Sequence, residues 1–140
     1  MAVFLCRAAG LAPVYPATPT FADVPTWAPE YGYVERLYRE KIVAGCALGP
    51  LRFCPFSPVT KLQMAVFLCR AARIPTVRPA VADFADVPVT HPWYAYVEGV
   101  YRAGVMGPCA TTPLSFCPNQ AVRRWEMAVM LCKAFQIPLN

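Results

Sequence analysis

The chain has 140 residues, of which 57% are hydrophobic and 15% are charged. This composition supports a folded core and excludes a disordered chain. Its 16 prolines, about twice the average usage, predict short elements joined by rigid turns. A net charge of +5 favours an anionic partner, but no basic run supports nucleic-acid binding. No stretch reaches the about 18 to 20 apolar residues of a transmembrane segment, so none is expected.

A long internal repeat organises the sequence. The opening nine residues, MAVFLCRAA, return at 64–72, and a variant, MAVMLCKAF, occupies 127–135. The starting methionines are 63 residues apart in both cases (64 − 1 and 127 − 64). A targeting signal does not recur in mid-chain, so the N-terminal stretch is not interpreted as a signal peptide. The repeat instead predicts either that Met1 is an interior methionine of a longer protein or that its helix is completed by a neighbouring chain.

Each period begins with a turn, FADVP at 21–25 and 84–88, followed by a predicted helix. Pro29 and Pro92 suit a first helical position. Apolar pairs at helical spacing continue the pattern, and we expect Gly45 in one period and Gly107-Pro108 in the other to end the helix. These pairs are Tyr33/Val34, Leu37/Tyr38 and Lys41/Ile42.

Cysteines flank the loop that follows each predicted first helix. Cys46 and Cys54 bracket seven residues, as do Cys109 and Cys117. We predict two disulfides, each closing its own loop and stabilising the fold by about 2 to 3 kcal/mol. Seven cysteines without a CxxC pair also favour an oxidising, extracellular compartment. A zinc site is the disfavoured alternative, because the chain has a single histidine, and no metal or cofactor is expected.

The second helix of each period is predicted from a cap and an apolar run. Thr60 and Gln63 form a capping-box pattern. Arg123 replaces the threonine in the second copy, which keeps Glu126 but loses the side-chain cap at a cost of about 1 kcal/mol. The run that follows is apolar on nearly every face, as in a helix surrounded by neighbours. Its three copies predict a mainly α fold built on a central three-helix bundle with a pseudo-threefold arrangement.

A third set of cysteines occupies one position of this apolar helix: Cys6, Cys69 and Cys132. Buried free thiols are the default interpretation. The alternative is a bond between two of them, which requires Cα atoms within about 7 Å on the pseudo-threefold axis.

The segments FADVP, YVERLYREKIVAGC and FSPVTKLQMAVFLCRAA resemble the S-layer homology repeat, and the second period resembles it equally well. The resemblance divides the chain into the closing helix of a truncated repeat (1–15) and two repeats (16–78 and 79–140). It implies three repeats packed as a pseudo-trimer. It also implies an exported module at the bacterial cell surface that binds cell-wall polysaccharide, often carrying acidic pyruvyl groups, in grooves between repeats.

The family's binding motif, Thr-Arg-Ala-Glu, implies a set of ligand-binding residues at the start of the second helix. A cation beside a helix N-terminus suits a carboxylate. Lysine lacks the planar two-point grip of arginine, so the groove of the first motif should be the weaker one. Trp93 is a further candidate, and Trp27 a weaker one, for stacking on a sugar ring; the alternatives are packing anchors, solvated cations and capping residues. The motif positions are Thr60, Lys61 and Gln63 in one repeat and Arg123, Arg124 and Glu126 in the other.

The sequence does not predict an enzyme, and no catalytic residue is assigned. His91 lies in a Thr-His-Pro turn without a neighbouring acid. Asp23 and Asp86 recur in the FADVP turns, where a carboxylate serves backbone N–H groups. The favoured function is a non-catalytic anchoring module for anionic cell-wall polysaccharide. The alternatives are a self-assembling extracellular structural subunit and a set of repeats packed against other domains of a larger parent protein.

Overall fold

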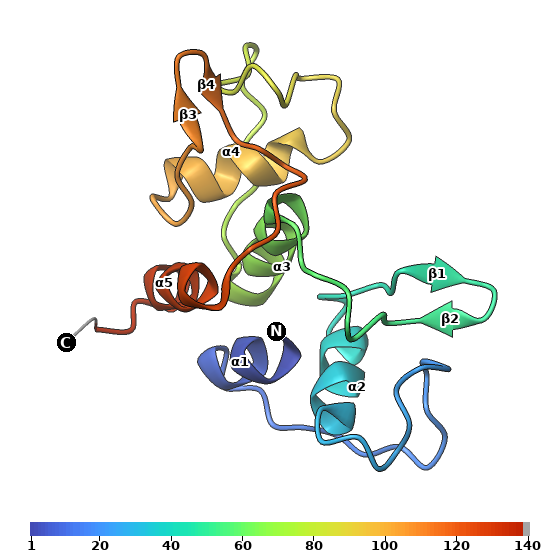
Figure 1. Cartoon of the computed structure of the whole chain (residues 1–140). Helices are drawn as coiled ribbons and strands as arrows, with labels where there is room; N and C mark the ends of the chain where they lie inside the picture. Colours follow the sequence, from blue (N-terminus) through green and yellow to red (C-terminus); the bar gives the residue numbers. More distant parts are fainter. Residues whose placement is uncertain (139–140) are drawn as a thin grey trace. The chain divides into compact units, whose positions relative to one another are not determined.

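The computed structural model describes residues 1–138, and these residues form a mainly α structure (Figure 1). Helices alternate with two short antiparallel hairpins. In chain order the elements are α1 (Ala2–Ala8), α2 (Tyr31–Arg39), β1 (Ala47–Leu48), β2 (Leu51–Arg52), α3 (Lys61–Ala72), α4 (Tyr94–Arg102), β3 (Ala110–Thr111), β4 (Leu114–Ser115) and α5 (Arg124–Phe135). None of the helices in this described part has the length and hydropathy of a transmembrane span.

The chain divides into two compact units that cut across the repeat of residues 16–78. The first unit, Met1–Ser57, contains α1, α2 and the first hairpin; the second begins at Pro58 and contains the other elements. Each unit therefore joins a helix of the MAVFLCRAA type to the turn, helix and hairpin that follow it. In the second unit α3 also contacts α5. The predicted bundle of three helices with pseudo-threefold symmetry remains a prediction.

In the first unit the amphipathic helix α2 packs against α1. Val34 and Leu37 of α2 are fully buried, as is Leu5 of α1, because the apolar residues of α2 recur at helical spacing. The ring of Phe21, from the FADVP turn, packs edge-on against Tyr38 and Phe53 with centroids 5.2 and 5.5 Å apart. The turn, the helix and the end of the hairpin thereby share one core.

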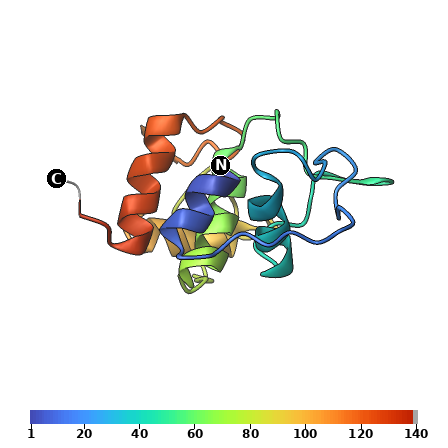
Figure 2. The ribbon, with the colours of Figure 1, turned by 90° about the horizontal axis from the view of Figure 1, so that it is seen from below.

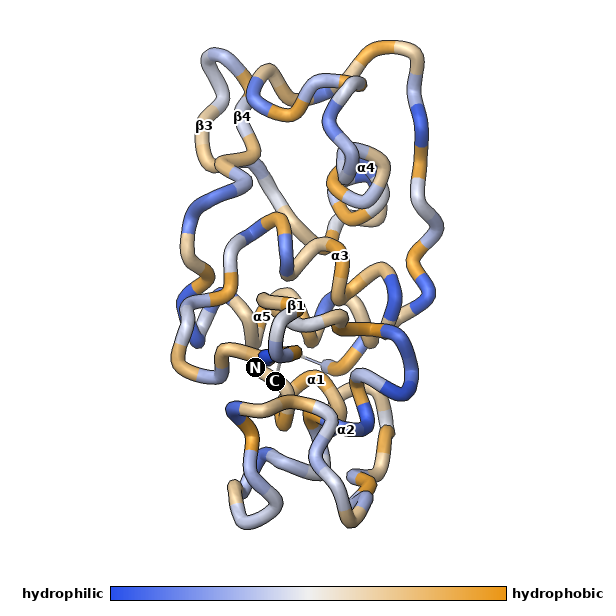
Figure 3. Tube along the Cα trace, turned by 90° about the vertical axis from the view of Figure 1, so that its right-hand side faces the viewer, coloured by the Kyte–Doolittle hydropathy of each residue, from blue (hydrophilic) through white to orange (hydrophobic). Residues whose placement is uncertain are grey.

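The second unit repeats this core on a longer helix. Val97 and Val100 of α4 are fully buried on the side of the unit where α4 packs against α3. Phe84 packs edge-on against Tyr101 and Phe116, with centroids 4.7 and 5.3 Å apart. Figure 3 colours the trace by hydropathy and shows hydrophobic residues around α3.

The predicted ends of the first helices are wrong. The helices begin two residues after Pro29 and Pro92, with Glu30 and Trp93 as N-caps. They end at Arg39 and Arg102, well before the glycines Gly45 and Gly107 that were expected to stop them.

The residues that reverse the chain are Lys41 and Gly104, which occupy equivalent positions with φ of 58° and 71°. Both lie in the left-handed region, which ends helices and favours glycine. The next residue in each unit then donates a backbone hydrogen bond to the helix, Ile42 N–H to the Leu37 carbonyl in the first unit. The helices end there because of this turn and not because of the later glycines.

The cysteine-flanked loops contain β structure that the sequence pattern did not predict. Strands β1 and β2 pair Ala47 with Arg52, and β3 and β4 pair Ala110 with Ser115. The two residues at each hairpin tip, 49–50 and 112–113, are joined by a cis peptide bond to proline. Strands of two residues give no alternating pattern long enough to detect.

The predicted capping box at the start of α3 is confirmed. The Gln63 N–H donates to Thr60 Oγ1 at 3.2 Å, and the Thr60 N–H donates to Gln63 Oε1 at 2.9 Å. At α5 the Arg123 N–H donates to Glu126 Oε2 at 2.7 Å, but Arg123 supplies no side-chain cap. The loss of half of the box in the second repeat is therefore confirmed.

The three helix cysteines are free, but they do not share one environment. Cys6 and Cys69 are buried, as predicted, and burial raises the pKa of both thiols to about 11. Cys132 is only half-buried. The prediction of a buried thiol is therefore wrong at Cys132, because the α5 face that carries it is less covered than its counterpart on α3.

Candidate ligand-binding site

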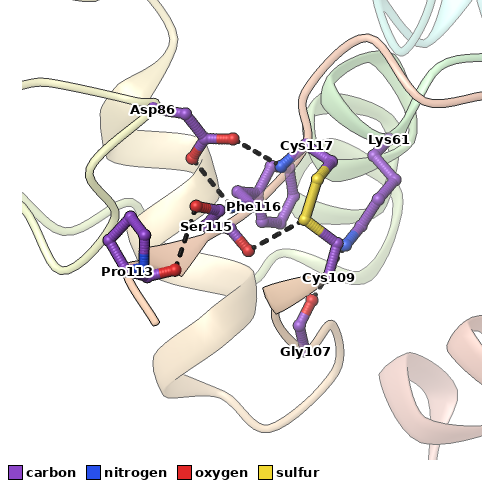
Figure 4. Close-up of a disulfide and its surroundings, with 8 residues drawn as sticks. All are labelled: Lys61, Asp86, Gly107, Cys109, Pro113, Ser115, Phe116 and Cys117. Atoms are coloured by element: carbon purple, nitrogen blue, oxygen red, sulfur yellow. Dashed lines mark hydrogen bonds between the residues drawn. A yellow bond between two sulfur atoms is a disulfide. The ribbon is translucent and has the colours of Figure 1, made fainter. Parts of the chain in front are cut away.

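Both predicted disulfides are present. They join Cys46 to Cys54 and Cys109 to Cys117, with Cα atoms 6.1 and 6.0 Å apart. Each closes the hairpin of its own repeat, so the pairing inferred from equal spacing is confirmed. Figure 4 shows the second disulfide beside Asp86 and Lys61.

The aspartate carboxylate of each FADVP turn accepts hydrogen bonds from backbone N–H groups at the end of the adjoining hairpin. Asp86 accepts hydrogen bonds from the backbone N–H groups of Phe116 and Cys117 at 2.8 and 2.7 Å (Figure 4). Asp23 makes the equivalent pair in the first unit, both at 2.8 Å. These contacts confirm the structural role predicted for the two aspartates, and they fix the hairpin that supports the candidate site.

The starts of α3 and α5 lie side by side in the second unit. Thr60 and Ala121 form an antiparallel bridge. The Lys61 N–H donates to the Gln120 carbonyl at 2.8 Å, and the Val122 N–H donates to the carbonyl of residue 59, also at 2.8 Å. In Figures 1 and 2 the segment before α5 runs alongside the start of α3. The structure thus brings together the two segments, 60–63 and 123–126, in which sequence reasoning placed the ligand-binding residues.

Lys61 points into the protein. Its side chain is buried, and Nζ donates to the Gly107 carbonyl at 2.9 Å (Figure 4). Nζ also lies 4.5 Å from the centroid of the Phe116 ring, a cation–π contact. The pKa of Lys61 is lowered by burial, and the negative charges of Glu126 and Asp86 offset only part of this shift. The ammonium group therefore holds the start of α3 against the loop after α4.

The start of α5 is open to solvent. Arg123, Arg124 and Trp125 are all exposed, and Trp125 retains 63% of its accessible surface. Two guanidinium groups next to a helix N-terminus form a positive site suited to a carboxylate. Trp125 adds an exposed aromatic ring, which sequence reasoning did not single out because the same motif position in the first repeat is Leu62.

Trp93 does not join this cluster. It is the N-cap of α4, and its ring packs at a tilt against Tyr96 with centroids 5.8 Å apart. The Arg70 guanidinium lies 5.8 Å from the centroid of the same Tyr96 ring. Arg70 follows Lys61 by nine residues on α3, a separation of about 13 Å along the helix. Trp93 thus lies toward the opposite end of α3 from the motif residues.

No group of three or more histidine, cysteine or acidic side chains within residues 1–138 is arranged to hold a metal ion. The exposed groups at the α5 start are two guanidinium groups and an aromatic ring, next to a helix N-terminus. Such a set suits an anion.

Comparison with known proteins relates part of this chain to a family. Residues 20–65 match the family model described as the S-layer homology domain. The chain is also similar to an endoglucanase of Bacillus sp. (strain KSM-635), with 27% identity over 119 residues, 83% of this chain and 12% of that enzyme. The chain thus spans about one-eighth of that relative, 12% of its length.

The family match covers the FADVP turn, α2, the first hairpin and the start of α3. S-layer homology domains are non-catalytic modules that anchor proteins to cell walls, and this activity implies association with the cell surface. The same turn, helix, hairpin and helix start recur 63 residues later, at 83–128. Residues 20–65 therefore match the S-layer homology domain, and residues 83–128 repeat their order of turn, helix, hairpin and helix start.

Proposed function

We propose that the chain anchors an extracellular protein to the bacterial cell surface by binding an anionic cell-wall polysaccharide at the start of α5. The observation that carries this proposal is the exposed pair Arg123 and Arg124 at the N-terminus of a twelve-residue helix. This helix lies in the repeat of the segment 20–65 that matches the S-layer homology domain. A guanidinium group can hold a carboxylate, such as a pyruvyl group, by two parallel hydrogen bonds. The positive end of the helix dipole adds to this attraction.

The other residues of the two motif segments support this surface in different ways. Glu126 fixes the start of α5 through the Arg123 backbone. Thr60 and Gln63 use their side chains to fix the start of α3 next to it. Lys61 contributes by holding that start in place, because its ammonium group donates to the Gly107 carbonyl. Exposed Trp125 offers a ring on which a sugar can stack.

Sedimentation of the purified protein with isolated cell walls tests the proposal. Arg124→Ala is expected to weaken binding about 10- to 100-fold, because it removes a charge-assisted hydrogen-bonding group worth about 1.5 to 3 kcal/mol. Lys61→Ala should weaken binding less. Arg39→Ala, an exposed arginine at the end of α2, is the matched control and should leave binding unchanged.

The ligand itself is tested by removing pyruvyl groups from the walls. Binding should then fall for the unmodified chain, and Arg124→Ala should lose little more. Equal losses for Lys61→Ala and Arg124→Ala would contradict the assignment of the anion to α5. Failure of the unmodified chain to sediment with untreated walls would contradict the proposed function altogether.

A further inference from the structure

The second disulfide adjoins both groups that hold the buried ammonium of Lys61 (Figure 4). The Gly107 carbonyl, which accepts a hydrogen bond from Nζ at 2.9 Å, lies two residues before Cys109. The Phe116 ring, whose centroid is 4.5 Å from Nζ, comes one residue before Cys117. The disulfide therefore joins the two backbone segments between which the ammonium group is held.

The segment that carries the Phe116 ring is anchored without the disulfide. The Phe116 N–H donates to Asp86 at 2.8 Å, and its ring packs edge-on against Phe84 with centroids 5.3 Å apart. The Leu114 carbonyl accepts from the Ala85 N–H at 2.9 Å. Because all these partners belong to the FADVP turn, the aromatic ring should keep its place when the disulfide is opened.

The segment that carries the Gly107 carbonyl depends more strongly on the disulfide. Met106 is buried, but residues 107–111 are all exposed. The Cys109 N–H donates to the Ser115 carbonyl at 2.8 Å, and the pairing of β3 with β4 continues from there. A hairpin with strands of two residues is marginal by itself. Opening the disulfide therefore loosens the backbone from Gly107 onward, and a glycine can turn its carbonyl at little steric cost.

The disulfide is accessible to a small reductant. Cys109 is exposed and Cys117 is half-buried, and exposed disulfides are the ones that are reduced most readily. A thiolate of a dithiol attacks one sulfur and forms a mixed disulfide, and the second thiol of the reagent then displaces the cysteine. The dithiol supplies two electrons and two protons and becomes a cyclic disulfide, so both cysteines end as thiols.

We propose that the Cys109–Cys117 disulfide controls the burial of Lys61, so that reduction by a dithiol releases the ammonium group from the Gly107 carbonyl and exposes it to solvent. Lys61 is the first residue of α3, and the preceding residue is bridged to Ala121 just before α5. Release therefore adds an exposed cation to the segment that adjoins the start of α5. The inference rests on the geometry around this hairpin and not on the proposed glycan binding.

Acetylation of lysine side chains under native conditions, followed by mass spectrometry, tests the proposal. The other lysines, Lys41 and Lys133, are exposed and serve as internal controls. In the oxidised chain Lys61 should react more slowly than both. After reduction by dithiothreitol and alkylation of the released thiols, Lys61 should react about 10-fold faster or more, because its protection depends on local opening. The rate at Lys133 should not change.

A matched pair of double variants assigns the effect to one disulfide. Cys109→Ser with Cys117→Ser should expose Lys61 without any reductant. Cys46→Ser with Cys54→Ser opens the equivalent hairpin of the first unit and should leave Lys61 protected until the second disulfide is reduced.

Hydrogen exchange of α4 separates local release from unfolding of the second unit. The amides of α4 should stay protected in the reduced chain while Lys61 reacts. If the serine variant at 109 and 117 does not fold, reduction of the unmodified chain still decides the question. The proposal is overturned if Lys61 reacts as fast as Lys133 in the oxidised chain, if it stays slow after reduction, or if it becomes reactive only when α4 loses its protection.

Discussion

The two turn–helix–hairpin halves share one backbone plan but satisfy their buried glutamates differently. In the first half Glu35 accepts from the Thr20 N–H at 2.8 Å and from its hydroxyl at 2.7 Å. In the second, Glu98 accepts from the Asp83 N–H at 2.8 Å and pairs with Arg102 at 3.3 Å; Arg102 also pairs with Asp83 at 2.9 Å. A neutral hydroxyl in one half is thus replaced by an ion-pair cluster in the other. Contacts that recur in both halves, such as those of Asp23 and Asp86, define the fold. The charged groups around the buried glutamate differ between the halves.

The recurring aspartates should carry the largest effects. Asp23→Ala and Asp86→Ala each leave two backbone N–H groups without an acceptor, so each should lower local stability by about 2 to 4 kcal/mol. Hydrogen exchange followed by mass spectrometry, read separately for residues 1–57 and 58–138, measures this. We expect each variant to affect its own unit, and by similar amounts.

Conservative replacements control for the loss of the side chain itself. Asp23→Asn and Asp86→Asn keep one acceptor oxygen and should lose less than the alanine variants. If one alanine variant were neutral and its counterpart severe, the two turns would not be equivalent, and the shared plan inferred from the repeat would fail at this contact.

The starts of the second helices provide a smaller difference between the repeats. Thr60→Ala removes the hydroxyl that accepts from the Gln63 N–H and should destabilise α3 by about 1 kcal/mol. Arg123→Thr restores the missing half of the box in α5 and should stabilise that helix by about the same amount. Local exchange rates in the first turn of each helix measure both effects. Thr111→Ala, at an exposed hairpin position, should change neither, and destabilisation by Arg123→Thr would contradict the capping argument.

Features with short-range causes could be predicted from the sequence. The capping box needs only Thr60 and Gln63, three residues apart. The disulfides followed from equal spacing of cysteines in the two periods. The helix ends were missed because Lys41, which adopts the left-handed conformation in the first repeat, is not a glycine and gives no sequence signal. Its equivalent, Gly104, was overlooked in favour of a later glycine.

The candidate site was predicted in composition but not in arrangement. The motif residues were identified by their resemblance to a family pattern, yet the bridge between Thr60 and Ala121 that places the two segments together joins residues 61 apart (121 − 60). Burial of Lys61 depends on the Gly107 carbonyl, which lies in the following repeat. Contacts of this kind depend on tertiary packing, which local pattern does not specify. Trp93 was grouped with the site by residue type alone, and packing places it elsewhere.

The smallest expected effect is on the pH dependence of the two units. Burial, together with the neighbouring Asp83, raises the pKa of Glu98 against the lowering effect of Arg102. The folded unit therefore holds the Glu98 proton more tightly than the unfolded chain does, and its stability should fall as pH rises above the ordinary value of 4.5 through the folded pKa. Glu98→Gln should remove this dependence in residues 58–138.

Asp23 in the first unit has the opposite pH dependence. Burial raises its pKa, but the N–H groups of Phe53 and Cys54 lower it, and the net pKa lies below the ordinary value of 3.8. The contribution of Asp23 to the stability of residues 1–57 is therefore lost as pH falls below that value. Exchange rates corrected for intrinsic pH dependence measure both trends across about pH 2 to 7, which extends beyond the ordinary pKa values of both carboxyl groups. A parallel response of the two units over this range would show that the ion-pair cluster does not distinguish the repeats.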